Sequence, residues 1–389
     1  MIKMTGVIKR NYSAEPQSGS PGPRADPLER DLPRVVELEL DTASDVRWSA
    51  FVQSHPKGLL YHHPAWVRAI ARVYRYPFVG LATEDASGKL TGVLPMFEKR
   101  GLVTGRRLSS LPHTPVAGLL AANDAAALAL GRAAMARARE RSLALELKLF
   151  SDELGRLLPA AGMVPADAAY VVELPDRVED LRFGDSRNHG RIKWAVRKAA
   201  KEGVKAREAE GDRDLRRWYS LYLETMHRHG VPPRPYAFFE AMWDTLVPGG
   251  HMRLLLAERT ALGRSTVIAG SILLMAAHTV SYAFNATRRE HVHERANDLI
   301  QWHAIHDACS GGFRRYDMGE VTVGQEGLAH FKAKWGATEH RLFRYRYPSP
   351  WHASMHGRAV LAHRAATAGW RRLPEPVAVR LGDWLYRHA

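Results

Sequence analysis

Cysteine is almost absent from this sequence. The 389 residues include a single one, Cys309. This excludes an internal disulfide and any zinc site built from several cysteines, and it suits a reducing cytosol. Histidine is more frequent, but the pairs His227/His229 and His291/His293 stand two residues apart. That spacing does not place two ligands on one helical face, and no glutamate completes a metal-binding motif. We therefore expect no metal ion and no other cofactor, and no serine or cysteine nucleophile motif is evident.

Long apolar runs are also missing. Residues 1–33 contain basic residues, proline, serine and glycine but no apolar stretch, so we expect a disordered leader and not a secretion signal. The longest apolar run, residues 267–284, is interrupted by Ser271, His278 and Ser281. These interruptions favour a hairpin of two buried strands over a membrane span. We expect a cytoplasmic protein, with a peripheral position at the inner face of the membrane as the alternative.

Acidic residues are too few to balance the basic ones. The chain has 56 Lys+Arg against 41 Asp+Glu, a formal net charge of +15 and a pI near 10.0. Such a charge predicts an anionic partner: nucleic acid, a phosphate-bearing substrate or acidic lipid headgroups. An arginine-rich and alanine-rich composition is also typical of GC-rich genomes, so the charge alone does not choose among these partners.

The order of the predicted elements is that of a duplicated α/β unit. In the first half, hydrophobic periodicity predicts helices at 48–52, 64–74, 124–141 and 152–161, and strands at 78–83, 90–98, 107–111, 144–150 and 169–174. In the second half it predicts strands at 252–258, 267–275, 279–286, 313–318 and 340–347, and helices at 298–310 and 326–335. Residues 92–96 match 270–274 at an offset of 178, and Gly162 matches Gly336 at 174. A near-constant offset indicates an internal duplication, so we expect a mixed α/β fold in two tandem domains.

One stretch, YDMGEVTVGQEGLAHFKAKWGA at residues 316–337, predicts a strand end, a glycine-bearing loop and a short helix that stops at Gly336. Leu328, Phe331 and Trp335 recur at helical spacing and predict one buried face. Lys332 lies at the edge of that face, where its stem can follow apolar surface while its ammonium enters a cleft. The alternative is a pair of solvated lysines on an amphipathic helix.

This stretch resembles the closing motif of the FemAB family, in which a strand ending in Asp-x-Gly precedes a helix bearing Phe-Lys-x-x-Trp-Gly. The resemblance extends over about residues 48–347. It implies two tandem GNAT-like domains, which have the acyl-CoA N-acyltransferase fold. It also implies an enzyme that moves an amino acid from aminoacyl-tRNA onto an amine of a peptidoglycan precursor.

Two residues of the motif are catalytic candidates. The resemblance implies that Lys332 neutralises the tetrahedral oxyanion, the leaving ribose hydroxyl or a nearby phosphate. Asp317, at a strand end, is placed to accept a proton from the amine or to orient it, and its alternative role is that of a buried hydrogen-bond partner. Because an aminoacyl ester is already activated, positioning and charge stabilisation are expected to supply most of the acceleration.

The substrate-binding candidates are mostly basic or aromatic. Residues 185–203 predict a helix with one apolar stripe. Another face carries Arg187, Arg191, Trp194 and Lys198. With Lys193, the cations of this helix are suited to holding phosphates, and Trp194 is suited to stacking on a base. A solvated face is the alternative. The resemblance adds four candidates near the cleft, Asn297, Trp302, Phe331 and Lys334, and for Asn297 helix capping is the simpler role.

The loops that would bind coenzyme A are poor in glycine. Single-domain GNAT transferases resemble one another in a [Gln/Arg]-x-x-Gly-x-[Gly/Ala] loop, whose backbone N–H groups hold a pyrophosphate at a helix N-terminus. The corresponding residues 288–297 contain no glycine, and residues 111–118 contain one at a different position. This pattern argues against coenzyme A as the acyl donor.

We divide the chain into a leader (1–33), a first GNAT-like domain (34–175), a second one carrying the closing motif (176–348) and a basic helical tail (349–389). In the tail, four apolar residues face one way: Val377, Leu381, Trp384 and Leu385. This face could lie on an anionic membrane, although packing on the protein itself is the more frequent outcome for such a tail.

The sequence thus favours a FemAB-type acyltransferase that uses aminoacyl-tRNA and forms an amide on an amine acceptor, such as a cell-wall precursor. The first alternative is an N-acyltransferase that uses acyl-CoA or acyl carrier protein in the biosynthesis of surface polysaccharide or lipid. The second alternative is a non-catalytic tandem-GNAT module that binds RNA or anionic membranes. Nothing in the sequence predicts an oligomeric state.

Overall fold

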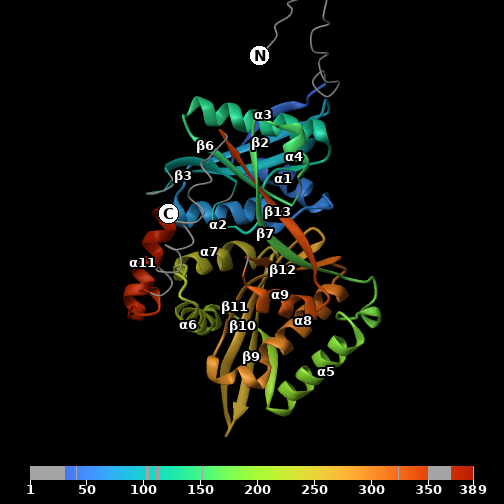
Figure 1. Ribbon diagram of the computed structural model, residues 1–389, viewed down its shortest axis with the longest axis vertical. Helices are drawn as coiled ribbons and strands as arrows, with labels where there is room; N and C mark the ends of the chain where they lie inside the picture. The colour runs from blue at the N-terminus through green and yellow to red at the C-terminus, as the bar shows by residue number, and fades with distance from the viewer. Residues whose placement is uncertain are drawn as a thin grey trace, which may run out of the picture.

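The computed structural model describes residues 31–348 and 369–388, apart from short gaps at 41, 102–104, 111, 113, 151 and 323. The expected disordered leader and the first part of the tail lie almost entirely outside these residues. The two halves of the chain lie end to end, and two long strands, β7 and β13, run through the centre of the molecule (Figure 1).

Both halves have the same order of elements. The first half contains β1 (Arg34–Leu38), α1 (Thr42–Ser54), α2 (Pro64–Tyr74), β2 (Phe78–Glu84), β3 (Leu90–Gly101), β4 (Gly105–Ser109), β5 (Leu120–Ala121), α3 (Asp124–Glu140), β6 (Ala144–Leu149), α4 (Glu153–Leu157) and β7 (Gly162–Glu173). The second half contains α5 (Ser186–Lys201), β8 (Val204–Glu208), α6 (Asp212–His229), α7 (Tyr236–Leu246), β9 (Met252–Ala261), β10 (Arg264–Ala276), β11 (Thr279–Thr287), η4 (Arg289–Glu294), α8 (Ala296–Ser310), β12 (Arg315–Val321), α9 (Glu326–Lys334) and β13 (Thr338–Tyr347).

Most of the predicted elements are present within a few residues of their expected bounds, because their local signals are strong. Pro64 begins α2, where the side chain of His63 accepts a hydrogen bond from the N–H of Ala65 at 3.2 Å. The side chain of Asn123 caps α3 by accepting from the N–H of Ala126 at 2.9 Å. The basic helix α5 likewise begins after its N-cap, Asp185.

Two features of the sequence prediction are wrong. The helix expected at 152–161 is only the short α4, and β7 begins at Gly162 where a helix stop was expected. The early start of β7 has a tertiary cause, because its first residues pair with β13 from the other end of the chain. The sequence patterns also did not predict β1, β8, α6 and α7.

All the strands form one sheet of 13 strands, in the order β1-β2-β3-β4-β6-β13-β7-β12-β11-β10-β9-β8, with β5 beside β3. The last strand of each half is exchanged. β13, which ends the second half, lies between β6 and β7 of the first half, and β7 pairs in turn with β12 of the second half. The expected boundary near residue 175 therefore divides the sequence into two halves, but the two halves share one sheet.

Helices cover both faces of this sheet. In the second half, α6 and α7 pack on one face with Ile272 and Leu274, while α5 and α8 pack on the other with Leu273. Side chains alternate across a strand, so neighbouring residues of β10 belong to different cores. The first core also contains α1 and α2, and it joins the two halves where the rings of Trp66 and Phe238 meet at 6.0 Å between centroids.

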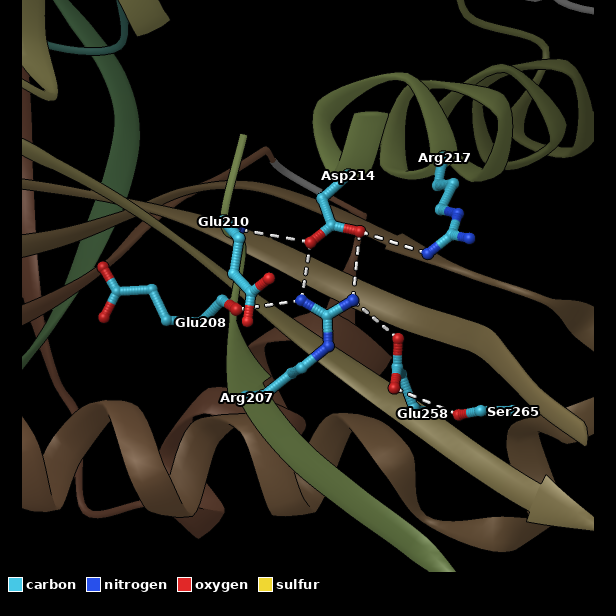
Figure 2. Close-up of polar contacts among 7 residues, drawn as sticks. All are labelled: Arg207, Glu208, Glu210, Asp214, Arg217, Glu258 and Ser265. Carbon is cyan, nitrogen blue, oxygen red and sulfur yellow. Dashed lines mark hydrogen bonds and ion pairs between the residues drawn. The ribbon is translucent and has the colours of Figure 1, made fainter. Parts of the chain in front are cut away.

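A partly buried polar network ties β8 to α6 and β9 (Figure 2). The guanidinium of Arg207 donates to both carboxylate oxygens of Asp214, at 2.6 and 3.0 Å, and to Glu258 at 2.6 Å. The bond to Arg207 lowers the pKa of Asp214 to about 2, so this carboxylate is ionised at neutral pH. The network fixes the start of α6 on the far end of the sheet.

The described part of the tail is one helix, α11 (Glu375–His388), and it packs on the protein as expected. Its inward face is formed by Ala378, Gly382 and Tyr386, and the hydroxyl of Tyr76 donates to the carbonyl of Tyr386 at 2.5 Å. The apolar face expected to be buried is instead the outer one, because three of its residues are exposed: Val377, Leu381 and Trp384. None of the helices that the structure describes is long and apolar enough to span a bilayer.

Candidate active site

The candidate site lies where two parallel strands of the second half separate. β11 and β12 pair only from Thr279 opposite Arg315 to Ser281 opposite Asp317. Beyond this point a pocket of about 340 Å³, the divergence pocket, opens between them, and its lining includes Ser281, Tyr282 and Asp317. Other lining residues, among them Trp66 and Phe284, belong to the core that contains α6 and α7, so the pocket lies on that face of the sheet.

A β-bulge in β12 brings a second carboxylate beside Asp317. Asp317 lies opposite Val171 of β7, and Glu320 lies opposite Ala169. Val171 and Ala169 are two residues apart and share one face of the sheet, so the extra residue in β12 turns Glu320 to the same face as Asp317. Gly319, within the bulge, has φ +80°, a conformation that side chains disfavour. Both carboxylates consequently line the divergence pocket.

Asp317, one of the two predicted catalytic residues, is buried in the floor of this pocket. Its Oδ1 accepts a hydrogen bond from the N–H of Gly319 at 2.8 Å. Burial raises the pKa of Asp317, and the Gly319 N–H and the ammonium of Lys332 oppose that rise. The side chain is thus both a hydrogen-bond partner of the bulge and a group that faces the pocket.

Lys332, the other predicted catalytic residue, is close to Asp317, and its side chain contacts the backbone of the bulge. Its ammonium donates to the carbonyls of Gly319 at 2.8 Å and Glu320 at 3.0 Å. The side chain is buried, with 4% of its surface exposed, and it is not among the described residues that line the pocket. Burial lowers its pKa to about 8. The expectation that its ammonium enters the cleft is wrong, because the two carbonyls hold it behind the pocket wall.

Glu320 is a functional candidate that the sequence patterns did not single out. It directly follows the Asp-x-Gly motif, which was the signal available for finding it. Burial and a hydrogen bond to Asp167 raise its pKa to about 7, although the nearby ammonium of Lys148 acts in the opposite direction. A carboxylate with a pKa near neutrality is well suited to take a proton from a substrate amine.

Two cations that were also missed complete the pocket wall. Lys148, at the end of β6, donates to the carbonyl of Thr114 at 2.7 Å. Arg234, in the loop between α6 and α7, lies against aromatic rings, with its guanidinium carbon 4.8 Å from the ring of Phe238 and 4.9 Å from that of Tyr386. The sequence carries no local motif at either position. Their charges can stabilise an anion that forms in the pocket.

A second pocket of about 540 Å³ adjoins the first and is called here the lateral pocket. Asp317 and Lys148 line both pockets, so the two meet at these residues. Most of the lateral pocket is lined by the first half, including the region around α4, and its remaining wall contains the start of β11 and β12.

The five candidates on α5 are not in either pocket. Arg187, Arg191, Lys193 and Trp194 are exposed and Lys198 is half-buried, on a helix that packs with α8 on the sheet face opposite Asp317. The ring of Trp194 is 55% exposed, and the ammonium of Lys198 and the guanidinium of Arg295 lie 5.6 and 5.7 Å from its centroid. The predicted apolar stripe of this helix is confirmed by its buried residues, Ile192, Ala195 and Ala199.

The four remaining candidates have structural surroundings. Trp302 and His306 are both on α8, and their rings pack together with centroids 4.1 Å apart. Trp302 is partly buried against the core that contains α8. Lys334 forms an ion pair with Asp298. Phe331 is half-buried against the same core, and Trp335 is fully buried. Leu328 was expected beside them, but it lies in the first turn of α9 and is 40% exposed.

Asn297 does not cap α8. The helix begins at Ala296 after Arg295, which has φ +61°, and no side chain caps it. The Oδ1 atom of Asn297 is buried without a hydrogen-bond partner among the described residues. The predicted capping role is therefore wrong, and the orphaned oxygen beside the start of α8 leaves a role in binding open.

Acidic residues occupy the helix N-termini at which a pyrophosphate would bind. The start of α8 is flanked by two buried carboxylates, Glu294 and Asp298, which pair with Arg259 and Lys334. The start of α3 carries the capping side chain of Asn123 and the carboxylate of Asp124. A helix N-terminus attracts anions through its free N–H groups and its dipole, and carboxylates placed there oppose the binding of a pyrophosphate. Over the described residues, no group of histidine, cysteine and acidic side chains is arranged to hold a metal ion.

Comparisons with known proteins agree with this geometry. Residues 186–333 match the model of the acetyltransferase (GNAT) domain. The crystal structure of FemX superposes with a TM-score of 0.64 at 17% identity, covering 80% of this chain and 96% of that one. The structure of L-PGS from Bacillus licheniformis gives 0.54 at 10% identity, covering 91% and 99% of the two chains. A search of curated protein sequences gives no match.

The fold and the matching domain define the class of this protein: it has two GNAT folds in tandem, and residues 186–333 match an acetyltransferase (GNAT) domain. Within that class its architecture is FemAB-like. The expected fold class is thereby confirmed.

Proposed function

We propose that this protein forms an amide by transferring an aminoacyl group from aminoacyl-tRNA to the amine of an acceptor, such as a cell-wall precursor, in the cytoplasm. The observation that carries the proposal is the divergence pocket, in which Glu320, Asp317 and two cations surround the gap between β11 and β12. A GNAT fold in general brings an acyl donor and an amine acceptor together.

The residues of the pocket support a simple sequence of steps. Glu320 takes a proton from the acceptor ammonium, and the free amine attacks the carbonyl carbon of the aminoacyl ester. The new C–N bond gives a tetrahedral oxyanion, which the charges of Lys148 and Arg234 stabilise. When the C–O bond to the ribose breaks, the proton held by Glu320 passes to the leaving oxygen, and the attacking nitrogen loses its second proton to solvent, which leaves the neutral amide. Lys332 acts as a positioning residue, because its two hydrogen bonds fix the bulge that orients Glu320.

Two observations support a tRNA donor over coenzyme A. The helix N-termini of α3 and α8 already carry acidic or capping side chains, which disfavours a pyrophosphate there. The exposed face of α5 offers cations and the ring of Trp194, which suit a phosphate backbone and an unpaired base. In this proposal, a donor held on the α5 face presents its ester where the pairing of β11 and β12 ends, to an acceptor on the other face.

The test compares two donor pools with an amine-containing cell extract as acceptor. One pool is charged tRNA with labelled amino acids, and the other is labelled acyl-CoA. We expect RNase-sensitive incorporation from the tRNA pool, reduced about 10²- to 10⁴-fold in Glu320→Gln. Glu326→Gln, an exposed glutamate of α9, is the matched control and should behave as the wild type.

Incorporation only from the acyl-CoA pool would contradict the tRNA donor and favour an N-acyltransferase that uses acyl-CoA or acyl carrier protein. The enzymatic proposal would be contradicted if labelled tRNA bound but no acceptor fraction gave turnover, and if Glu320→Gln bound tRNA as the wild type does. This outcome would favour the alternative of a non-catalytic RNA-binding module.

A further inference from the structure

The lateral pocket has an apolar part that the proposed chemistry does not use. Its apolar lining includes a group of residues from the first half, around β5, β6 and α4: Leu119, Leu120, Leu149, Phe150, Leu154 and Leu157. Its volume of about 540 Å³ is in the range of pockets that enclose small organic ligands. Leu149 and Leu154 are themselves buried, so this part of the wall is a fixed apolar surface.

The opposite wall of the same pocket is polar and belongs to the reaction site. Thr279, Arg315 and Asp317 line it from the first residues of β11 and β12. Glu173, at the end of β7, adds a second carboxylate. The pocket therefore has an apolar sleeve in the first half and a polar mouth in the second, and the mouth opens at the carboxylate that also lines the divergence pocket.

We infer that the lateral pocket binds a hydrocarbon chain carried by the acceptor, so that the acceptor is an amphipathic amine and its ammonium rests at Asp317. This inference rests on the proposed function, since it assigns the amine to the acceptor. Arg315 lies opposite Glu173 in the sheet and can offset its charge. Asp317 is the carboxylate at the mouth that also reaches the divergence pocket, and it can accept a charge-assisted hydrogen bond from a cationic head. An aminoacyl donor has no chain long enough to use the sleeve.

The shape of the sleeve is set by close packing on its far side. A Cβ atom added to Gly118 would lie 2.2 Å from Cδ2 of Leu149 and 2.6 Å from the carbonyl oxygen of Lys148. Gly118 thus allows the loop before α3 to lie directly on β6, which brings Leu119 and Leu120 to the sleeve.

The inference is tested by calorimetric titration of the full-length protein with n-alkylamines of six to twelve carbons. Burial of each methylene is expected to tighten binding about fourfold until the sleeve is full. Ala127→Phe places a large ring in the sleeve from α3, and should weaken dodecylamine binding at least tenfold while leaving hexylamine nearly unchanged. Ala127 is half-buried and lines the pocket.

Ala136→Phe is the matched control, because it puts the same side chain on α3 outside the lateral pocket; it should bind as the wild type. Leu157→Gln, at a half-buried position of the sleeve, guards against a folding defect in Ala127→Phe and should also flatten the chain-length series. Circular dichroism melting of each variant separates lost binding from lost structure.

Affinity that does not change with chain length would overturn the inference, as would full binding by both sleeve variants. A parallel series of fatty acids and acyl-CoA thioesters distinguishes the two sources of a chain. Chain-length dependence in these and not in the amines would assign the sleeve to the donor and overturn the acceptor assignment. The titrations need no turnover, so a failure of the proposed transfer reaction leaves their result readable.

Discussion

Glu320 is the residue on which the proposed chemistry depends, and one glycine decides where it points. In a regular strand, residues three apart point to opposite faces, so Asp317 and Glu320 would not share a pocket. The bulge at Gly319 removes this difference in β12. Lys332 then fixes the bulge from behind through two backbone carbonyls. The catalytic arrangement is thus a property of the backbone as much as of the side chains.

The pKa values of Glu320 and Lys332 predict a narrow pH optimum for transfer. Glu320, with a pKa near 7, must lose its proton before it can act as a base, so kcat should rise as the pH increases through 7. Lys332, with a pKa near 8, loses its charge above that pH, which weakens its hold on the bulge. A pH–rate profile should therefore be bell-shaped, with limbs near 7 and 8.

Two variants assign the limbs of this profile. Glu320→Gln should lose the acidic limb together with most of the activity, and Lys332→Met should lose the alkaline limb. An unchanged acidic limb in the residual activity of Glu320→Gln would mean that another group is the base.

Gly319→Ala tests the bulge itself. A side chain at φ +80° costs about 1–2 kcal/mol, so we expect a modest loss of stability in urea unfolding. The larger effect should be on kcat, because relaxing the bulge turns Glu320 away from the pocket. Gly263→Ala is the matched control, since Gly263 has φ +73° in a hairpin turn with open space around it. It should lose similar stability and retain activity, and equal losses of activity in both variants would argue against a special role of the bulge.

At the scale of elements, the helix α5 is the part of the molecule proposed to hold the donor. Its cations and the ring of Trp194 face solvent on the side of the sheet that carries α8. This placement separates donor recognition from the pocket that receives the amine. The two substrates can then approach the gap between β11 and β12 from different faces.

Removing the aromatic face of α5 should weaken tRNA binding more than removing one charge. A base stacked on an aromatic ring contributes about 1–3 kcal/mol, so Trp194→Ala should raise the Kd for tRNA about 5- to 150-fold in a filter-binding assay. Lys198→Ala should instead reduce the salt dependence of binding, because one phosphate contact is lost. Arg139→Ala, an exposed cation on α3, is the control. Unchanged affinity in Trp194→Ala would exclude stacking on this helix.

Elements with strong local signals could be predicted from the sequence, and those set by distant contacts could not. The repeated strand-helix order, the basic helix and the Asp-x-Gly motif gave the fold class, Asp317 and the neighbourhood of Lys332. The early start of β7 depends on β13, and the position of Glu320 depends on the bulge. Lys148 and Arg234 come from distant segments that meet only in the folded chain. The strand and helix periodicities of a sequence carry no information about contacts between distant segments.

At the scale of the whole molecule, the exchanged strands make the halves depend on one another. Without β13, the first half would expose the edges of β6 and β7, and without β7 the second half would expose an edge of β12. Unpaired strand edges invite aggregation and leave backbone groups unsatisfied. The strands that flank the exchanged pair, β6 and β12, carry Lys148, Asp317 and Glu320 of the divergence pocket.

Fragments that divide the chain near residue 175 should therefore fail to fold alone. We expect residues 31–175 and 176–389 to aggregate or remain unfolded when expressed separately, as judged by circular dichroism and size-exclusion chromatography. Co-expression should recover a complex, because each fragment supplies the strand that the other lacks. A chain shortened to residue 348 keeps every strand of the sheet and is the control. A stable, monomeric 31–175 fragment would contradict this dependence.

The place of β13 also has a consequence for synthesis on the ribosome. The first half is complete in sequence at Glu173, but its sheet cannot close until Thr338–Tyr347 has left the exit tunnel. At the usual elongation rates of about 5–20 residues per second, this is a delay on the order of ten seconds or more. During that time the nascent chain presents the open edges of β6 and β7. A nascent-chain chaperone that shields such edges would therefore be expected to influence the yield of this protein more than its final stability.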